Sequence, residues 1–327
     1  MYNIAIIGAT GNVGRMFLSI LEERNFPINE LFLFASKKSN GTYLKFKDKN
    51  YLVQETIEDN IKNKKIDYAL FSAGGEISLK YSPIFTKYNA IVIDNSNAWR
   101  MDKNVPLVVP EVNPEDLNNH RGIISNPNCS TIQAMIPLKI LKDNYGLKRI
   151  IYSTYQAVSG AGIGGINDLK NGVSGIPPTK FPHPIFNNCI PQIDIFLDNG
   201  YTKEEIKMIN ETKKILHDDS LKITATAVRV PVKNCHSESI NIELLKNFNL
   251  KDIINLFSSS KGLTVYDEKD SLKYPMPILT TGEDNVYIGR IRRDFSIDNG
   301  LNIWVVADNL RKGAALNAIQ ILEMLTK

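Results

Sequence analysis

The sequence predicts an α/β protein of two domains: an N-terminal domain built on a parallel sheet, and an α+β domain whose mixed sheet is largely antiparallel. The chain has 327 residues, which is too long for one ordinary hydrophobic core. In residues 1–125, short apolar runs alternate with helical patterns, as in a parallel sheet that is covered on both faces. Beyond Leu147 the runs are longer and alternate in polarity, which is typical of an antiparallel sheet with one exposed face.

The first domain is expected to comprise residues 1–127, completed by a C-terminal helix within residues 309–327. Its strands are predicted at 2–7, 31–35, 66–73, 90–94, 107–110 and 122–125. A helix is predicted at 13–23, because its apolar residues recur on one face.

The second domain is expected to span residues 128–308 and to begin with a helix at 130–145, despite Pro137. Strands are predicted at 149–160, 222–232, 239–245, 285–293 and 301–308, with a helix at 203–217. The stretch 171–191 is rich in proline, glycine and asparagine and is therefore predicted to be irregular.

The composition excludes several classes of protein. The net charge of +4, from 39 basic and 35 acidic residues, is too small to indicate nucleic-acid binding. Apolar runs are too short for a membrane span, and a glycine-rich turn interrupts the first of them, unlike a signal peptide. Three cysteines are too few for a disulfide framework and indicate free thiols in a reducing cytoplasm. No metal site is predicted.

The segment GATGNVG at residues 8–14 follows the first strand and opens the first helix. Its glycines allow a tight turn, and the helix N-terminus offers free N–H groups to a pyrophosphate. This placement indicates a Rossmann-like dinucleotide site; an ordinary turn is the alternative. The second strand ends in Ser36-Lys37-Lys38-Ser39, without the acid that binds the ribose hydroxyls of NAD. The sequence therefore favours NADP, against the alternative of two solvated lysines.

Cys129 lies in the segment SNPNCST, residues 125–131. Free cysteines are more often buried and inert than catalytic. Cys129, however, begins a predicted helix at the carboxyl end of a predicted strand, where a thiolate is favoured and α/β sheets bind ligands. Asn126 and Asn128 offer amide donors to a developing oxyanion. Cys189 and Cys235 lack this setting.

A thiolate nucleophile needs a proton carrier, and the chain has four histidines: His120, His183, His217 and His236. His236 begins a predicted strand shortly after Arg229 and is the predicted acid/base partner, with a structural histidine as the alternative. A thiol beside a nicotinamide predicts hydride exchange with a thiohemiacetal, and leaves water, coenzyme A or phosphate as the third reactant.

Several motifs occur in order over nearly the whole chain: GATGNVG, FASKKS, SNPNCST, QAVSGAG, EEIKM with ETKKI, RVPVKNCHSE and VADNLRKGAA. Together they closely resemble aspartate-β-semialdehyde dehydrogenases of the bacterial type. The resemblance implies the reversible, NADP-dependent reductive dephosphorylation of L-4-aspartyl phosphate to L-aspartate 4-semialdehyde. This step leads to lysine, threonine, methionine and isoleucine. The resemblance also implies a homodimer, which in some members associates further into a tetramer.

The resemblance assigns roles position by position. Cys129 matches the nucleophile, His236 the acid/base catalyst, and Gln156 the glutamine that orients the acyl intermediate. Arg229 matches the residue that binds the α-carboxylate of the substrate, and Glu204 the acid near its amino group. Arg100 and Lys207 match the pair that binds the phosphate, and Asn128 matches a further substrate contact. Without the resemblance, Glu204 and Lys207 are more typical of solvated surface charges. Cofactor contacts fall on Gly8, Thr10, Gly11, Asn12, Val13, Ser36, Lys38, Ser39, Ser72, Gly74, Ser159, Gly160, Gly162 and Asn309.

Two positions depart from the family pattern. Lys38 stands where arginine is common, which weakens the expected preference for NADP. Cys235 stands where glycine is usual, and a second thiol beside His236 predicts sensitivity to oxidants. The nearest rival activity is that of N-acetyl-γ-glutamyl-phosphate reductase, whose acylated amine has no use for an acid such as Glu204. A non-catalytic NADP-binding paralogue is a further alternative, although the cysteine and the histidine are both present.

Overall fold

The computed structural model describes residues 1–326. It divides into two compact units. The first unit comprises Met1–Asn128 and the described residues from Ala314 onward, and the second comprises Cys129–Gly313. The chain therefore enters the second unit at the cysteine singled out above. The assignment of these units to cofactor and substrate remains a prediction.

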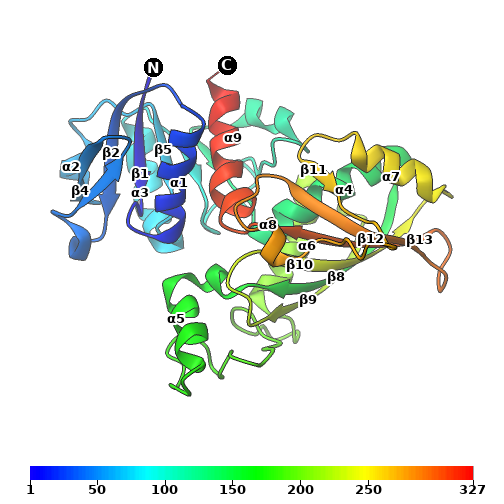
Figure 1. The fold of residues 1–327 in the computed structure, drawn as a ribbon. Coiled ribbons are helices and arrows are strands. Elements are labelled where there is room, and N and C mark those ends of the chain that lie inside the picture. The colour runs from blue at the N-terminus through cyan, green and yellow to red at the C-terminus, as the bar shows by residue number, and fades with distance from the viewer. Residues whose placement is uncertain (327) are drawn as a thin grey trace. The chain divides into compact units, whose positions relative to one another are not determined.

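A seven-stranded sheet forms the centre of the first unit, in the order β3-β4-β2-β1-β5-β6-β7 (Figure 1). Its strands are β1 (Tyr2–Ile7), β2 (Ile28–Ala35), β3 (Tyr43–Phe46), β4 (Lys49–Glu55), β5 (Tyr68–Phe71), β6 (Ile91–Asp94) and β7 (Ile123–Ser125). Neighbouring strands are parallel, except that β3 and β4 form an antiparallel hairpin. The prediction of a parallel-sheet domain is confirmed.

Helices cover both faces of this sheet. On one face lie α1 (Asn12–Glu23) and α9 (Leu316–Leu325), and on the other α3 (Gly75–Lys87), with the short α2 (Glu58–Ile61) beside it. Alternate residues of β1 point into the two cores, Ile4 and Ile6 into one and Ala5 and Ile7 into the other. The strand is therefore apolar on both faces from Ile4 to Ile7.

Two details of this unit correct the sequence-based prediction. Residues 107–110 are not a strand and contribute an isolated bridge from Leu107 to Ser125. The side chain of Asn113 takes the hydrogen bonds that a neighbouring strand would supply, because it donates to Leu107 O and accepts from Val109 N at 2.9 Å each. The β3–β4 hairpin was not anticipated, because its alternation of exposed and buried residues is short and is interrupted by charged residues.

A six-stranded sheet forms the second unit, in the order β11-β12-β13-β10-β8-β9. Its strands are β8 (Leu147–Gln156), β9 (Lys222–Arg229), β10 (His236–Leu244), β11 (Leu263–Val265), β12 (Val286–Asp294) and β13 (Gly300–Ala307). The pairs β8–β9 and β11–β12 are parallel, and the others are antiparallel. The prediction of a largely antiparallel mixed sheet is confirmed.

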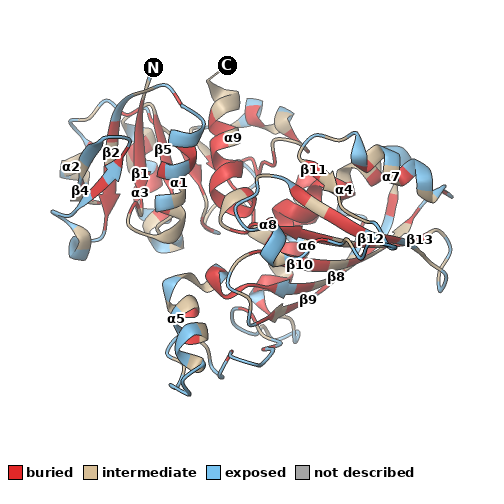
Figure 2. Ribbon diagram, viewed as in Figure 1, coloured by how far each residue is buried: buried red, intermediate tan, exposed pale blue. Residues whose placement is uncertain are grey.

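One face of this sheet is covered by α4 (Cys129–Tyr145), α6 (Lys203–Ile215) and α7 (Leu250–Ser258). Along β8 the residues alternate between buried and more exposed, so one side of this strand faces the helices (Figure 2). The unit also contains α5 (Gly162–Gly172) and α8 (Pro277–Thr280). Of the predicted irregular stretch 171–191, Asn171 and Gly172 still belong to α5, and residues 173–191 form no helix and only an isolated bridge from Ile190 to Arg229. Of the described helices, none has both the length and the apolar surface that crossing a bilayer requires.

Candidate active site

The glycine-rich loop connects β1 to α1 and can be built only with glycine. Gly8 has φ +81°, and a Cβ at this position would lie 2.8 Å from Ser72 O. A Cβ on Gly14 would lie 2.3 Å from Gly8 O, so α1 packs directly on the loop. No side chain caps α1, and the buried Asn12 Nδ2 has no partner among the described residues. The loop thus keeps donors available at a helix N-terminus, which suits a pyrophosphate.

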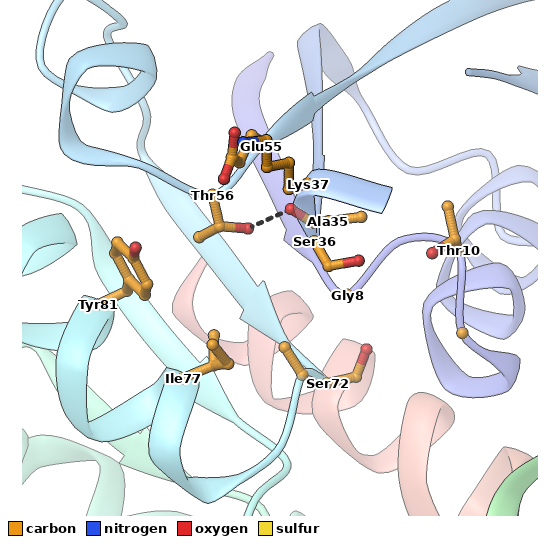
Figure 3. A pocket seen from close by; sticks show the side chains of 12 residues that line it. Gly8, Thr10, Ala35, Ser36, Lys37, Glu55, Thr56, Ser72, Ile77 and Tyr81 are labelled. Carbon is orange, nitrogen blue, oxygen red and sulfur yellow. Dashed lines mark hydrogen bonds between the residues drawn. The ribbon is translucent and has the colours of Figure 1, made fainter. Parts of the chain in front are cut away.

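A pocket of about 470 Å³ opens beside this loop (Figure 3). It lies at the carboxyl ends of β1, β2, β4 and β5, where α/β sheets bind ligands. Its lining residues are Gly8, Thr10, Gly11, Ala35, Ser36, Lys37, Glu55, Thr56, Ser72, Ala73, Ile77 and Tyr81. Of the predicted cofactor contacts, Gly8, Thr10, Gly11, Ser36 and Ser72 line it. The glycine cradle, hydroxyls and lysine of this pocket fit a dinucleotide.

Other residues at this pocket differ from the prediction. Lys37 lines the pocket and Lys38 does not, while Ser39 Oγ lies 3.3 Å from Thr10 Oγ1 and ties the turn η1 (Lys37–Ser39) to the glycine loop. Glu55 ends β4 opposite Ala35. It was missed because the β4 strand was not predicted, so nothing located residue 55 beside the second strand. Thr56 was missed for the same reason; its hydroxyl donates to Ala35 O at 3.1 Å (Figure 3).

The remaining cofactor candidates of this unit belong to the same two turns. Val13 follows Asn12 in the first turn of α1. Gly74 has φ +89° and immediately precedes α3, so it shapes the turn after β5 rather than lining the pocket.

Arg100 and Asn126 form a polar cluster beyond the ends of β6 and β7. Arg100 Nε donates to Asn126 O at 3.0 Å, and its Nη2 donates to Asn95 O at 2.9 Å. The amide of Asn126 donates to Asn95 Oδ1 and to Ala314 O. The hydrogen bonds of the Asn126 side chain therefore stabilise the fold of the first unit. The expected amide donor for an oxyanion is then Asn128 alone, which remains a prediction.

Cys129 is the first residue of α4 and is half-buried. One turn later, Gln133 Nε2 donates to His236 O at 3.2 Å, so the start of α4 lies against the start of β10. Arg229 interacts electrostatically with Cys129. A helix N-terminus and a nearby cation are the two features that favour a thiolate.

His236 is fully buried, and its hydrogen bonds fix its tautomer. Nδ1 accepts from Ala157 N at 3.0 Å, so the proton of the neutral ring lies on Nε2. Nε2 has no partner among the described residues. Burial, and then the charge of Arg229, hold the pKa of His236 well below 6.5. The ring is thus a neutral donor whose N–H is available to a ligand.

Gly160 is the point at which His236 and Arg229 meet. A Cβ on Gly160 would lie 3.0 Å from Arg229 Nη1 and 3.2 Å from His236 Nε2. Arg229 Nη1 donates to Ala157 O at 2.7 Å, and the same Ala157 donates its N–H to His236. Ala157, which lies between β8 and the short helical turn η3 (Val158–Ala161), therefore orients both side chains, and the missing side chain of Gly160 leaves space beside them.

Arg229 is buried and lies over an aromatic ring that sequence reasoning missed. Its guanidinium carbon lies 5.8 Å from the centroid of Phe181. Burial lowers the pKa of Arg229 below its ordinary value. Phe181 belongs to the irregular stretch, and Asp168 of α5 holds it there by accepting from Phe181 N at 2.9 Å and Lys180 N at 2.8 Å. No local sequence pattern pointed to this contact.

Gln156, Glu204 and Lys207 form a chain of hydrogen bonds next to Arg229. Gln156 stands opposite Arg229 in the β8–β9 ladder, and its Nε2 donates to Glu204 Oε1 at 3.2 Å. Lys207 Nζ donates to Glu204 Oε2 at 3.2 Å and to Asp194 Oδ2 at 2.8 Å. Burial lowers the pKa of Lys207, but the nearby carboxylates of Glu204 and Asp194 raise it by more. The pKa of Lys207 therefore lies above the ordinary 10.5. Glu204 is 5% exposed, so it is not a solvated surface charge.

A capping box positions Glu204 and Lys207 on α6. Thr202 Oγ1 accepts from Glu205 N at 3.4 Å, and Glu205 Oε2 accepts from Thr202 N at 2.7 Å. The second carboxylate oxygen of Glu205 accepts from Ala227 N at 2.9 Å, which ties the helix to β9. The pattern Thr-x-x-Glu before an amphipathic run is a sequence signal of a helix start, and α6 begins at residue 203 as predicted.

Asn309 connects the loop after β8 to the segment before His236. Its Nδ2 donates to Ser159 Oγ at 3.0 Å, and its Oδ1 accepts from Cys235 N at 2.9 Å. Gly162, with φ +76°, begins α5 at the end of this loop. Ser159 and Asn309 thus act on the framework around His236, whatever they contribute to cofactor binding.

Cys235 is buried in a left-handed backbone conformation, with φ +71°. Few residues other than glycine adopt this conformation. Its Sγ lies 3.3 Å from Thr281 Oγ1, and burial raises the pKa of the thiol to about 11. A buried, protonated thiol reacts slowly, which argues against the predicted sensitivity to oxidants.

Three comparisons with known proteins point to one family. A family model described as "Semialdehyde dehydrogenase, NAD binding domain" matches residues 3–120, and one described as "Semialdehyde dehydrogenase, dimerisation domain" matches residues 138–312. An aspartate-semialdehyde dehydrogenase of Aquifex aeolicus is 52% identical, over the whole chain and 98% of the relative. The chain belongs to the aspartate-semialdehyde dehydrogenase family. The resemblance inferred from the motifs is confirmed.

Solved structures of this family share the fold. Aspartate-semialdehyde dehydrogenase II of Vibrio cholerae is 45% identical and superposes with a TM-score of 0.95, over the whole chain and 98% of the relative. The same enzyme has been solved in complex with ASA. A more distant family member, from Candida albicans, was solved with NADP and has 25% identity and a TM-score of 0.76, over the whole chain and 98% of that relative.

Within this family fold, one further buried residue was missed by sequence reasoning. Glu238 follows His236 by two positions on the same face of β10 and is fully buried. Neither carboxylate oxygen has a hydrogen-bond partner among the described residues. Burial, and then the charge of Glu204, raise its pKa well above 4.5.

The predicted site residues divide between the two units. The second unit contains Cys129, Gln156, Ser159, Gly160, Gly162, Glu204, Lys207, Arg229, His236 and Asn309. The first contains Arg100, Asn128 and the dinucleotide pocket. Family membership and the donor set of the pocket support a nicotinamide cofactor.

Proposed function

We propose that this chain is a cytoplasmic, NADP-dependent aspartate-semialdehyde dehydrogenase. It would catalyse the reversible reductive dephosphorylation of L-4-aspartyl phosphate to L-aspartate 4-semialdehyde, on the route to lysine, threonine, methionine and isoleucine. The observation that carries the proposal is the meeting of a buried, neutral His236 with Arg229 across Gly160. The Gln156–Glu204 pair adjoins them.

The substrate has complementary charges at its two ends. Arg229 presents a planar donor group, which suits the α-carboxylate. Glu204 offers its carboxylate to the amino group, a role that an acylated amine could not use. Lys207 remains charged, because its pKa is raised, and would hold the phosphate together with Arg100. Binding both ends fixes the acyl carbon, so positioning supplies part of the rate.

The chemistry follows from Cys129 and His236. The thiolate of Cys129 attacks the acyl carbon; a C–S bond forms, the C–O bond to phosphate breaks, and phosphate leaves with the bonding electrons. His236 holds a proton on Nε2 and donates it towards the oxygen that gains negative charge. When bound, NADPH supplies the hydride that reduces the thioester. Expulsion of the Cys129 thiolate then releases the semialdehyde.

Two features bear on the choice of NADP over NAD. Ser36 and Lys37 line the pocket and suit an additional phosphate, whereas Glu55 of the same pocket opposes it. We therefore infer a moderate preference for NADP. The Candida albicans relative that was solved with NADP supports the same cofactor.

We also infer a homodimer formed through the face of the six-stranded sheet opposite α4, α6 and α7. Tyr155 and Trp304 stack on that face with ring centroids 5.5 Å apart, and Tyr155 is 40% exposed. The family model that matches residues 138–312 describes a dimerisation domain. A tetramer would require a second contact surface.

The test is reduction of NADP by L-aspartate 4-semialdehyde in the presence and absence of phosphate. N-acetylglutamate semialdehyde and NAD are run in parallel. We expect phosphate-dependent turnover that is fastest with aspartate semialdehyde and NADP. Cys129→Ala should lower kcat by about a thousandfold or more, because the covalent route is lost. Cys189→Ala, which changes an exposed cysteine, is the matched control and should retain activity. Faster turnover of the acetylated substrate, or an active Cys129→Ala variant, would contradict the proposal.

A further inference from the structure

Gly313 lies directly against Cys129. It belongs to the π-helical turn η4 (Arg311–Ala315), which precedes α9. A Cβ on Gly313 would lie 3.0 Å from Cys129 Cβ, 3.4 Å from its Cα and 3.5 Å from its carbonyl oxygen. Non-bonded carbon atoms normally lie about 3.5–4.0 Å apart. A side chain at position 313 would therefore have to displace the cysteine or the turn.

Space, not backbone conformation, is what requires glycine at this position. Gly313 is not among the residues with a positive φ, so its backbone conformation would accept an L-residue. This distinguishes it from Gly8, where both the conformation and the space demand glycine. The single atom that alanine would add is directed at the proposed nucleophile.

The turn that carries Gly313 has little freedom to retreat. Gly313 N donates to Asp308 O at 3.0 Å. Asp308 Oδ1 accepts from Leu310 N at 2.9 Å and Arg311 N at 3.1 Å, while its Oδ2 accepts from Gly282 N at 2.9 Å. The neighbouring Lys312 is only 1% exposed. Backbone bonds and burial thus hold the turn in place.

The helix that begins at Cys129 is equally constrained. Ser130, Thr131 and Ile132 are fully buried. Gln133 is tied to the carbonyl of His236, which is itself fully buried. If a side chain at position 313 displaced Cys129, the backbone of Cys129 would therefore shift and its thiol would point in another direction.

We propose that Gly313 is a positioning residue for Cys129: the widened turn brings a residue without a side chain against the cysteine and defines the position of its Cβ. This rests on the proposed function, in which Cys129 attacks the acyl carbon. π-Helical turns occur frequently at functional sites. A misplacement of a reacting atom by about 1 Å can lower a rate by about a hundredfold.

The experiment compares Gly313→Ala with Gly164→Ala in the full-length protein. Gly164 lies in α5, and the atoms nearest to a Cβ there belong to the exposed side chain of Lys180, at 3.3–3.6 Å. For each variant, kcat and KM for aspartate semialdehyde, the Kd for NADP and the melting temperature are measured. The rate of alkylation of Cys129 by iodoacetamide is read by peptide mass spectrometry, with the exposed Cys189 as the internal reference.

For Gly313→Ala we expect kcat to fall by about 10- to 100-fold. KM and the Kd for NADP should stay within about threefold of the wild type, and Cys129 alkylation should slow several-fold while that of Cys189 is unchanged. Gly164→Ala should match the wild type in every measurement. A purely structural role would lower the melting temperature of Gly313→Ala without separating kcat from KM.

Wild-type kcat and wild-type alkylation of Cys129 in Gly313→Ala would overturn the inference. If this variant does not fold, Asp308→Asn replaces it: it slackens the turn without adding an atom, and an unchanged kcat would likewise contradict the proposal. If the wild-type protein does not turn over aspartate semialdehyde, the proposed function fails, whereas the alkylation comparison still tests the role of Gly313.

Discussion

His236 and Glu238 lie on the same face of β10 and are both fully buried. Burial disfavours the charged form of each, so it lowers the pKa of the histidine and raises that of the glutamic acid. The cation against Gly160 is Arg229, and His236 beside it carries no charge. A neutral histidine beside a fixed cation can donate a hydrogen bond without repelling an anionic substrate.

We predict that Glu238→Gln changes the pH dependence of stability. The folded protein binds the Glu238 proton more tightly than the unfolded chain does. This contribution is complete below the ordinary pKa of 4.5 and is lost as the pH rises towards the raised pKa of the folded state. The free energy of unfolding of the wild type should therefore fall with pH relative to the variant, by at most about 1.4 kcal/mol per pH unit.

Urea unfolding of both proteins between about pH 5 and about pH 8 measures this difference. Glu30→Gln, which changes an exposed side chain, is the matched control and should leave the pH dependence as it is in the wild type. Parallel stability curves for the wild type and Glu238→Gln would show that Glu238 is ionised in the folded protein.

The irregular stretch after α5 illustrates how one helix organises a segment without secondary structure. Asp168 accepts from the backbone N–H groups of Thr179, Lys180 and Phe181. Phe181 in turn supports Arg229. A buried carboxylate thus replaces the hydrogen bonds that a strand would have provided, and fixes one wall of the proposed substrate site.

We predict that Asp168→Asn weakens substrate binding. The asparagine amide presents N–H donors to backbone N–H groups, so part of the anchoring of residues 179–181 is lost. Losing charge-assisted bonds should raise KM for aspartate semialdehyde by about tenfold, with a smaller effect on kcat. Steady-state kinetics check this. Asp198→Asn, which changes an exposed residue outside this stretch, is the control; an unchanged KM in Asp168→Asn would show that Phe181 does not need this anchor.

The helices α4, α6 and α7 cover one face of the six-stranded sheet, and the part of the opposite face around Tyr155 is a candidate for subunit contact. A sheet face with exposed aromatic residues is rarely left to solvent in a monomer. We predict that Tyr155→Arg converts the proposed dimer to monomers, because it places a charge at the centre of that face. Analytical ultracentrifugation gives the oligomeric state. Tyr43→Arg changes a tyrosine of the other unit that is 63% exposed and should leave the dimer intact. Dimers of Tyr155→Arg would rule this face out as the interface.

The sequence was most informative where short segments carry the signal. The apolar run of β1, the glycine loop and the helix starting near Cys129 were all predicted, because each depends on neighbouring residues. The prediction of a strand at 107–110 was wrong, because the side chain of Asn113, which lies outside this run, forms hydrogen bonds with its backbone N–H and C=O groups. Glu55 and Thr56 were missed, because their place in the pocket depends on the pairing of β4 with β2.

The proposed active site divides in the same way. Residue types and motifs alone identified Cys129, His236 and Arg229 as candidates, since thiol, imidazole and guanidinium carry intrinsic chemistry. The fold was needed to bring Gly160 between His236 and Arg229, and to bring Gly313 against Cys129. It was also needed to show that His236 and Glu238 are held neutral. The physical reason is that contact between distant segments, and the charge that burial allows, depend on three-dimensional packing rather than on neighbours in the chain.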